Sequence, residues 1–200
     1  MKLEPTKKLA EAGQNLVRTS NFLKAEMSYL VAPLRKSNDY VRDAEAVMFS
    51  YRSVVRAQIS HIEAVCHLMR KMVLSVDEEK LKIVFTDAEI LRLQDKKVDR
   101  KDSSKHITFF PDSLSNLGFS FGSFAKVFAP NFVLQKSGVG WEHYLVLLRV
   151  RNRLTHPKSF DSQMVTGDET ESAHIADDWF TKEVNRLLHL AKKENTFLAN

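Results

Sequence analysis

Residues 141–158, WEHYLVLLRVRNRLTHPK, begin as an apolar helix and end in charged and polar groups. Large apolar side chains recur there at the three-to-four-residue spacing of an α-helix. With Leu148 as the reference, those nearest the centre of one face are Trp141, Tyr144 and Leu145. Proline disfavours helical geometry in the residue before it, so Pro157 predicts that the helix ends at His156.

The last turn of this predicted helix carries polar side chains where the apolar face should continue. The positions in line with Leu148 are Arg151, Asn152 and Thr155, with His156 at the edge of the face. Arg153 is expected to point well away from it. Burying a guanidinium, an amide or an imidazole costs several kcal/mol unless the group has partners or lines a cavity. Such a violation of the apolar pattern is typical of a functional site.

Working outward from this helix, the rest of the chain also predicts helices with short connections. The 200 residues include only six Gly and five Pro, too few for many turns, and 44% are hydrophobic, enough for one core. Helical spacing predicts further helices over about 5–32, 39–74, 75–91, 113–128 and 171–195. We therefore predict an all-α fold, a bundle of five to six helices that forms a single domain over residues 1–200.

The longest predicted helix, opened by Asn38 or Asp39 as its N-cap, is expected to lie at the centre of the bundle. Its apolar stripe comprises Met48, Tyr51, Val55, Ile59, Ile62, Cys66, Met69 and Val73. Arginines such as Arg70 are placed on its other sides. The single cysteine, Cys66, excludes an internal disulfide, favours a reducing compartment, and is expected to fill the core.

Three polar segments connect or flank the other predicted helices. The run Ser75-Val76-Asp77-Glu78 fits a capping box at the start of the third helix. Residues 95–105, DKKVDRKDSSK, predict a solvated surface loop, with nucleic-acid contact as the alternative, before a short extended segment over 106–110. Residues 161–178 carry six acids and no Lys or Arg, so they either balance the basic end of the 141–158 helix or form a gate over it.

Several functional classes are excluded by composition. The first twenty residues lack the apolar segment of a signal peptide, and no apolar run approaches the roughly 18 residues of a membrane span, so we expect a cytoplasmic protein without membrane association. Neither a glycine-rich phosphate loop nor a nucleophile elbow occurs, and His61 and His67 lack further ligands at zinc spacing. We therefore expect no metal and no cofactor. The net charge of +5 is compatible with a polyanionic partner.

The candidate catalytic residues are Arg151, Asn152 and His156. An arginine binds phosphate through a planar fork of donors and stabilises charge that develops on it. A histidine titrates near neutral pH and can transfer protons. RNA supplies its own nucleophile, the 2′-hydroxyl, so these groups could suffice for cleavage, and a symmetric dimer would provide two histidines. Three further cations, Arg149, Arg153 and Lys158, would attract RNA without sequence preference.

The run Arg151-Asn152-Arg153-Leu154-Thr155-His156 resembles the R-x4–6-H motif of the HEPN superfamily, in the form with Asn directly after the Arg. The resemblance implies an α-helical homodimer whose Arg and His residues line a cleft at the interface. It also implies metal-independent RNA cleavage that leaves a 2′,3′-cyclic phosphate. Toxin–antitoxin or anti-phage defence is the implied setting, with an antitoxin or regulatory protein as a further partner. Arg56 with His61, and Arg100 with His106, share the spacing but lie off the apolar stripe and in the charged segment.

Two alternatives stay open at this point. The Arg151–His156 cluster could be a polar tie between this helix and its neighbours, or to an acid such as Asp161. The protein could also be a catalytically silent HEPN-like module that dimerises and recruits a protein partner. If the site is active, Glu63 and Glu142 are the candidates for an auxiliary acid.

Overall fold

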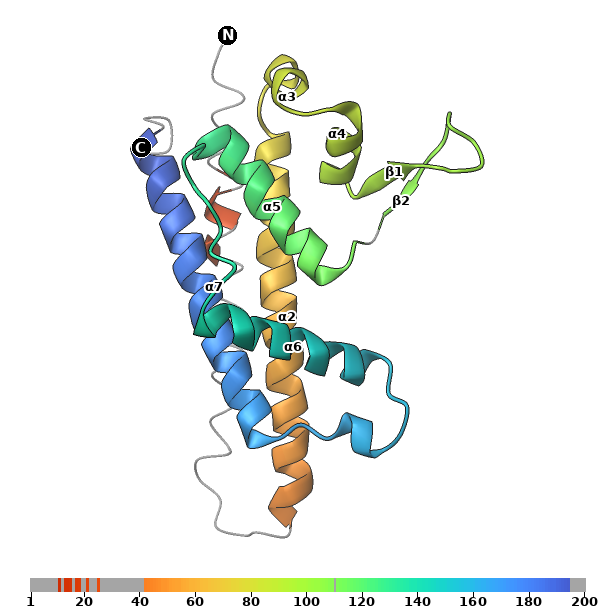
Figure 1. Ribbon diagram of the computed structural model, residues 1–200, viewed down its shortest axis with the longest axis vertical. Helices are drawn as coiled ribbons and strands as arrows, with labels where there is room; N and C mark the ends of the chain where they lie inside the picture. Colours follow the sequence, from red (N-terminus) through yellow and green to blue (C-terminus); the bar gives the residue numbers. More distant parts are fainter. Residues whose placement is uncertain are drawn as a thin grey trace. The chain divides into compact units, whose positions relative to one another are not determined.

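The computed structural model describes residues 42–109 and 111–194, together with positions 11, 13–15, 17, 18, 21 and 25 (Figure 1). This part of the chain is mostly helical and contains one small antiparallel sheet, which confirms the predicted all-α class. The helix predicted over 5–32 lies largely outside the described residues, as does the N-cap at Asn38 or Asp39. Within the described part, no helix has the length and apolar character needed to span a membrane.

The chain divides into two compact units, each built from segments that are separate in the sequence. The first unit comprises Met1–Arg18, Glu63–Leu134 and Asn185–Asn200. The second unit comprises Thr19–Ile62 and Gln135–Val184. Two long helices, α2 (Arg42–Leu74) and α7 (Gly167–Glu194), contribute residues to both units.

In the first unit, α5 (Ser113–Phe128) supplies most of the aromatic core. Its apolar side chains at helical spacing are buried: Leu117, Phe121, Phe124 and Phe128. The carboxylate of Asp112 accepts a hydrogen bond from the Ser115 backbone N–H at 2.8 Å, so Asp112 is the N-cap of this helix. The end of α2 contributes Cys66, Met69 and Val73 to the core of this unit. Burial raises the pKa of the Cys66 thiol to about 12, despite the nearby Arg70 guanidinium, so this cysteine is a core residue as predicted.

The predicted third helix is two short helices, α3 (Glu78–Val84) and α4 (Asp87–Leu93). The break lies at Phe85 and Thr86, because Thr86 and Glu89 form a capping box that starts α4. The predicted capping box from Ser75 to Glu78 is wrong. Asp77 is the N-cap of α3, and the Ser75 hydroxyl donates instead to the Met72 carbonyl at 2.7 Å.

The predicted surface loop over 95–105 is in part an antiparallel hairpin. Strand β1 (Lys96–Val98) pairs with β2 (His106–Thr108), and the partners are Lys96↔Thr108, Lys97↔Ile107 and Val98↔His106. The extended segment predicted after Lys105 is therefore confirmed over β2. The Phe109 N–H donates to the Asp95 carbonyl at 2.8 Å and closes the base of the hairpin.

Arg70, predicted on the outside of α2, is buried with only 5% of its surface exposed. It lies four residues after Cys66 and therefore on the buried face of the helix. Its guanidinium donates to the Asp95 carboxylate at 2.7 Å, to the Ser120 hydroxyl at 2.9 Å and to the Asn116 amide oxygen. These partners compensate the cost of burying the charge.

In the second unit, α2 and α7 run in the same direction. The Gln58 amide nitrogen lies 3.2 Å from His174 Nδ1, and His61 Nδ1 lies 3.0 Å from Asp177 Oδ1. The second contact thus lies three residues further along both α2 and α7, which shows that the two helices are parallel there. Asp177, one of the six acids of residues 161–178, therefore has a structural partner in His61.

Helix α6 (Val139–Thr155) completes this unit and lies across α7 (Figure 1). Its first turn contacts α7 through Trp141, whose ring centroid lies 5.4 Å from that of Trp179. A Cβ added to Gly140 would lie 2.5 Å from the Trp179 Cβ, so only glycine allows this close approach. The helix starts after Gly138, which has φ +82°, and His156 is its C-cap, so the predicted C-terminal end is confirmed.

We predict that Gly140→Ala destabilises the fold, because the added methyl group would overlap Trp179. Chemical denaturation should show a loss of about 1–3 kcal/mol in the free energy of unfolding. Gly122→Ala in α5 is the matched control, since nothing lies within 4 Å of its added Cβ. Helix propensity should make that variant more stable by up to about 1 kcal/mol. Equal stability of the two variants would contradict the close packing at Gly140.

Candidate functional site

The buried face of α6 differs from the predicted face. Its buried residues are Tyr144, Leu147, Val150 and Leu154, whereas Leu148 is only partly buried. The centre of the face is thus one residue, or about 100°, away from the predicted centre. Arg151 projects about 40° from Leu147, within the angular range of the buried residues, and is half-buried.

The three predicted catalytic residues share the last turn of α6 and its C-cap. The Arg151 guanidinium donates to the Asn152 side-chain oxygen at 3.2 Å. The Asn152 carbonyl accepts the backbone N–H of His156 at 3.0 Å, and the Thr155 hydroxyl donates to the Arg151 carbonyl at 2.8 Å. Asn152 and His156 are exposed. These polar groups therefore face solvent, and the desolvation cost that the sequence pattern implied applies only to Arg151.

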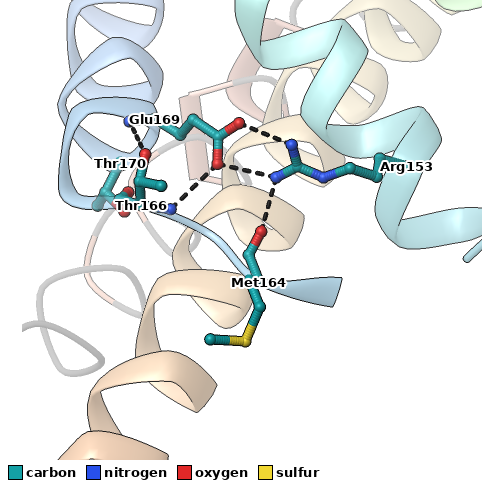
Figure 2. A network of polar contacts seen from close by, with 5 residues as sticks. All are labelled: Arg153, Met164, Thr166, Glu169 and Thr170. Atoms are coloured by element: carbon teal, nitrogen blue, oxygen red, sulfur yellow. Dashed lines mark hydrogen bonds and ion pairs between the residues drawn. The ribbon is translucent and has the colours of Figure 1, made fainter. Parts of the chain in front are cut away.

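Arg153 is held inside the second unit by a pair of hydrogen bonds to one carboxylate. Figure 2 shows its guanidinium donating to both oxygens of Glu169, at 2.9 and 2.8 Å, and to the Met164 carbonyl at 2.7 Å. Two parallel bonds to a carboxylate are among the stronger polar contacts in proteins. They connect the end of α6 to the start of α7.

The same carboxylate also caps α7. One Glu169 oxygen accepts the Thr166 backbone N–H at 3.0 Å, and the Thr166 hydroxyl accepts the Glu169 N–H at 3.2 Å (Figure 2). This reciprocal pair is a capping box, and helix α7 therefore begins at Gly167, four residues before the predicted start. The Thr-x-x-Glu spacing was visible in the sequence, so Glu169 is a positioning residue that the pattern could have identified.

The charge states of this pair follow from its geometry. Partial burial alone would raise the pKa of Glu169, but the hydrogen bonds from Arg153 and Thr166 outweigh it, and the net shift is downward. The bond to Glu169 raises the pKa of Arg153. Both groups are therefore ionised at neutral pH, and the charge of Arg153 is compensated. Glu169, one of the six acids of residues 161–178, thus pairs with a cation of the basic helix.

The loop after His156 is ordered by serine hydrogen bonds. The backbone N–H groups of Lys158 and Ser159 both donate to the Ser162 hydroxyl, at 3.0 and 3.1 Å, just before a short 3₁₀ helix, η2 (Asp161–Gln163). The Lys158 side chain is exposed on this loop, as is Arg149 on α6. Neither forms an ion pair with another residue of the described chain. Phe160 is also exposed, by 74%, an aromatic residue that the sequence analysis did not identify.

Of the two candidate auxiliary acids, Glu142 lies away from this cluster. Glu142 is in the first turn of α6, so helix geometry separates it from Arg151 by about 13 Å along the axis. Glu63 belongs to the first unit, where it accepts the Ser113 hydroxyl at 3.1 Å. No group of three or more His, Cys, Asp or Glu side chains in the described residues is arranged to hold a metal ion.

Comparison of the chain with protein-family models, curated proteins and solved structures finds no match. The HEPN resemblance therefore depends on the motif at residues 151–156 and on its position at the end of a helix in an all-α fold.

We predict that Arg153→Gln lowers the free energy of unfolding by about 1 kcal/mol at neutral pH, because one partner of a partly exposed ion pair is lost. The stability given by a carboxyl group with a lowered pKa is present above its ordinary pKa of 4.5 and is lost as the pH falls through the folded-state value. The difference from the wild-type protein should therefore shrink in acid. Chemical denaturation at several pH values measures it.

The matched control is Arg149→Gln, which removes the same charge from an exposed position of the same helix. Its stability should stay within about 0.5 kcal/mol of the wild-type protein. An equal loss in both variants, or a loss at Arg153 that is independent of pH, would contradict the assigned role of Glu169.

Proposed function

We propose that the protein is a metal-independent endoribonuclease of the HEPN type. The observation that carries this proposal is the grouping of Arg151, Asn152 and His156 on one exposed helix end. An arginine, an amide and an imidazole at a solvent-facing helix end form a site that a large polyanion can reach.

Arg151 would hold the scissile phosphate. The residue is half-buried and its guanidinium is hydrogen-bonded to Asn152, so fewer side-chain conformations remain to be lost when it binds. Asn152 would therefore orient the arginine. The backbone of Asn152 also fixes the C-cap at His156. His156 would transfer protons, and its exposed position lets the ring reach a substrate that approaches from solvent.

The proposed reaction is an internal transfer at phosphorus. The 2′-oxygen loses its proton to a base and attacks the adjacent phosphorus, while the bond from phosphorus to the 5′-oxygen of the next nucleotide breaks. A proton from an acid completes the leaving 5′-hydroxyl, and the other product ends in a 2′,3′-cyclic phosphate. One His156 per chain supplies a single proton-transfer group, so a symmetric homodimer would provide the base and the acid.

The remaining cations would have separate tasks. Arg149 and Lys158 are exposed near the proposed site and would attract the RNA backbone, which makes binding sensitive to salt. Arg153 was expected to share this role, but its guanidinium is bonded to Glu169 and Met164. In this proposal it instead holds the last turn of α6 in place. A cytoplasmic toxin–antitoxin or anti-phage setting, with an antitoxin or regulatory protein, completes the proposal.

A specific observation favours a second candidate, a non-catalytic helical module that recruits a protein partner. Three large hydrophobic side chains of the second unit are strongly exposed: Phe49 by 61%, Val139 by 66% and Phe160 by 74%. Exposed apolar residues are typical of protein interfaces when they form a patch. Phe160 follows His156 by four residues, so it would suit either a dimer contact beside the site or a binding partner.

We predict that the wild-type protein cleaves total RNA or transfer RNA in EDTA, and that Arg151→Gln and His156→Ala each lower the rate at least about 100-fold. Both side chains lie at the surface or at the edge of the core, so the melting temperatures should change little. Arg56→Gln and His189→Ala are matched controls, because both residues are exposed on other helices. These controls should cleave at the wild-type rate.

The binding module predicts a different pattern. In that case the folded wild-type protein cleaves neither RNA, and no substitution at these four positions changes its activity. Cleavage that persists in Arg151→Gln and His156→Ala would show that the activity comes from a contaminating nuclease. Loss of cleavage in the control variants as well would show that it depends on general charge.

A further inference from the structure

The hairpin of the first unit is a basic arm, defined here as residues 96–108. Figure 1 shows it reaching outward from the end of α4. It contains five Lys or Arg and two Asp, a net charge of +3, whereas the whole chain carries +5. Every residue of both strands is exposed. Most of the excess positive charge of the protein is thus on one slender element.

The base of the arm is fixed to the first unit by a series of cation–π contacts. The Arg92 guanidinium lies 4.1 Å from the centroid of the Phe119 ring and 5.9 Å from that of Phe109. The Lys97 ammonium lies 5.2 Å from the Phe109 centroid. Arg92 also donates to the Ser115 carbonyl at 3.0 Å. These contacts orient the arm, so binding would not have to order it.

The two acids of the arm are used within the arm. Asp99 accepts the Lys101 backbone N–H at 3.0 Å, and Asp102 accepts the Ser104 N–H at 3.0 Å. Asp102 also pairs with the Lys105 ammonium at 3.1 Å. Hydrogen bonds from Ser104 and Lys105 lower the pKa of Asp102, so it stays ionised and keeps these contacts.

Three cations of the arm are left to act on a partner. Lys96 lies on the strand face opposite to Lys97, and Arg100 and Lys101 lie at the tip. All three are exposed, and none forms an ion pair with another residue in the described part of the chain. The strand face that carries Lys96 also presents His106 and Thr108, which add hydrogen-bonding groups.

We propose that the basic arm binds the phosphate backbone of single-stranded RNA. The choice of RNA among polyanions rests on the proposed ribonuclease function, while the binding itself rests on the arm. A lipid surface fits less well, because the tip DRKDSS has no large apolar side chain to insert. A protein partner also fits less well, because Val98 and Ile107 are the only large apolar residues of the arm.

The test compares two triple variants of the full chain, each in the His156→Ala background so that RNA stays intact. Lys96→Gln/Arg100→Gln/Lys101→Gln removes the arm cations, and Lys97 is kept because it contacts Phe109. Lys80→Gln/Lys192→Gln/Lys193→Gln removes the same charge from exposed positions elsewhere. Fluorescence anisotropy with a short single-stranded RNA gives the affinity of each at several salt concentrations.

The arm variant should bind about 100-fold more weakly at ~0.1 M salt, and the slope of log affinity against log salt should fall by about 2, as expected for three lost phosphate contacts. The control triple should stay within about threefold of the parent. Lys96→Arg/Lys101→Arg, which keeps the charge, should also retain binding. Unchanged melting temperatures are expected for all variants, because every substituted side chain is exposed.

Equal weakening in both triples, unchanged binding in the arm variant, or no RNA binding by the parent would overturn the proposal. Arm-dependent binding of duplex DNA or of anionic vesicles in preference to RNA would also overturn it. The proposed function is tested separately by cleavage. Arm-dependent RNA binding without cleavage by the wild-type protein would support the role of the arm and contradict the ribonuclease function. Cleavage with arm-independent binding would support the ribonuclease function and contradict the role of the arm.

Discussion

The Glu169 carboxylate joins the end of one helix to the start of another, and the candidate site depends on that joint. It accepts two hydrogen bonds from Arg153 in the last turn of α6 and one from the backbone of Thr166 at the start of α7. The side of that last turn opposite to Arg153 carries Arg151, about 160° away, and the next residues lead to His156. A turn anchored on one side by an ion pair can present polar groups to solvent on the other without fraying.

Much of the fold could be predicted where apolar spacing was unambiguous. Phe121, Phe124 and Phe128 recur on one buried face of α5, and Pro157 predicted the end of α6. The orientation of α6 could not be predicted, because residues 144–148, YLVLL, are apolar all round and give the helix no unique face. Contacts with Trp179 and the pairing of Arg153 select the face instead. The hairpin could not be predicted from apolar spacing either, because its strands are short and exposed on both sides.

The charged residues were predicted less well than the apolar ones, and for a physical reason. A cation is expected at the surface unless a partner compensates its burial, and the partner can come from any part of the chain. Asp95 and Asn116 compensate the burial of the Arg70 charge, and Glu169 compensates that of Arg153. Neither pairing shows in the spacing of α2 or α6 alone. Of these partners, only Glu169 could be identified from local sequence, because Thr166 and Glu169 have the spacing of a capping box.

The proposed activity of this site is RNA cleavage through the 2′-hydroxyl of the substrate without a metal ion. The most direct measurement incubates the wild-type protein in EDTA with an RNA oligonucleotide that it cuts, and with a matched oligonucleotide that has 2′-deoxyribose at the cut nucleotide. Mass spectrometry should find a 2′,3′-cyclic phosphate end on the first product and no cut at that position in the second. Cleavage that continues at the deoxy position, or that requires added metal, would contradict the account.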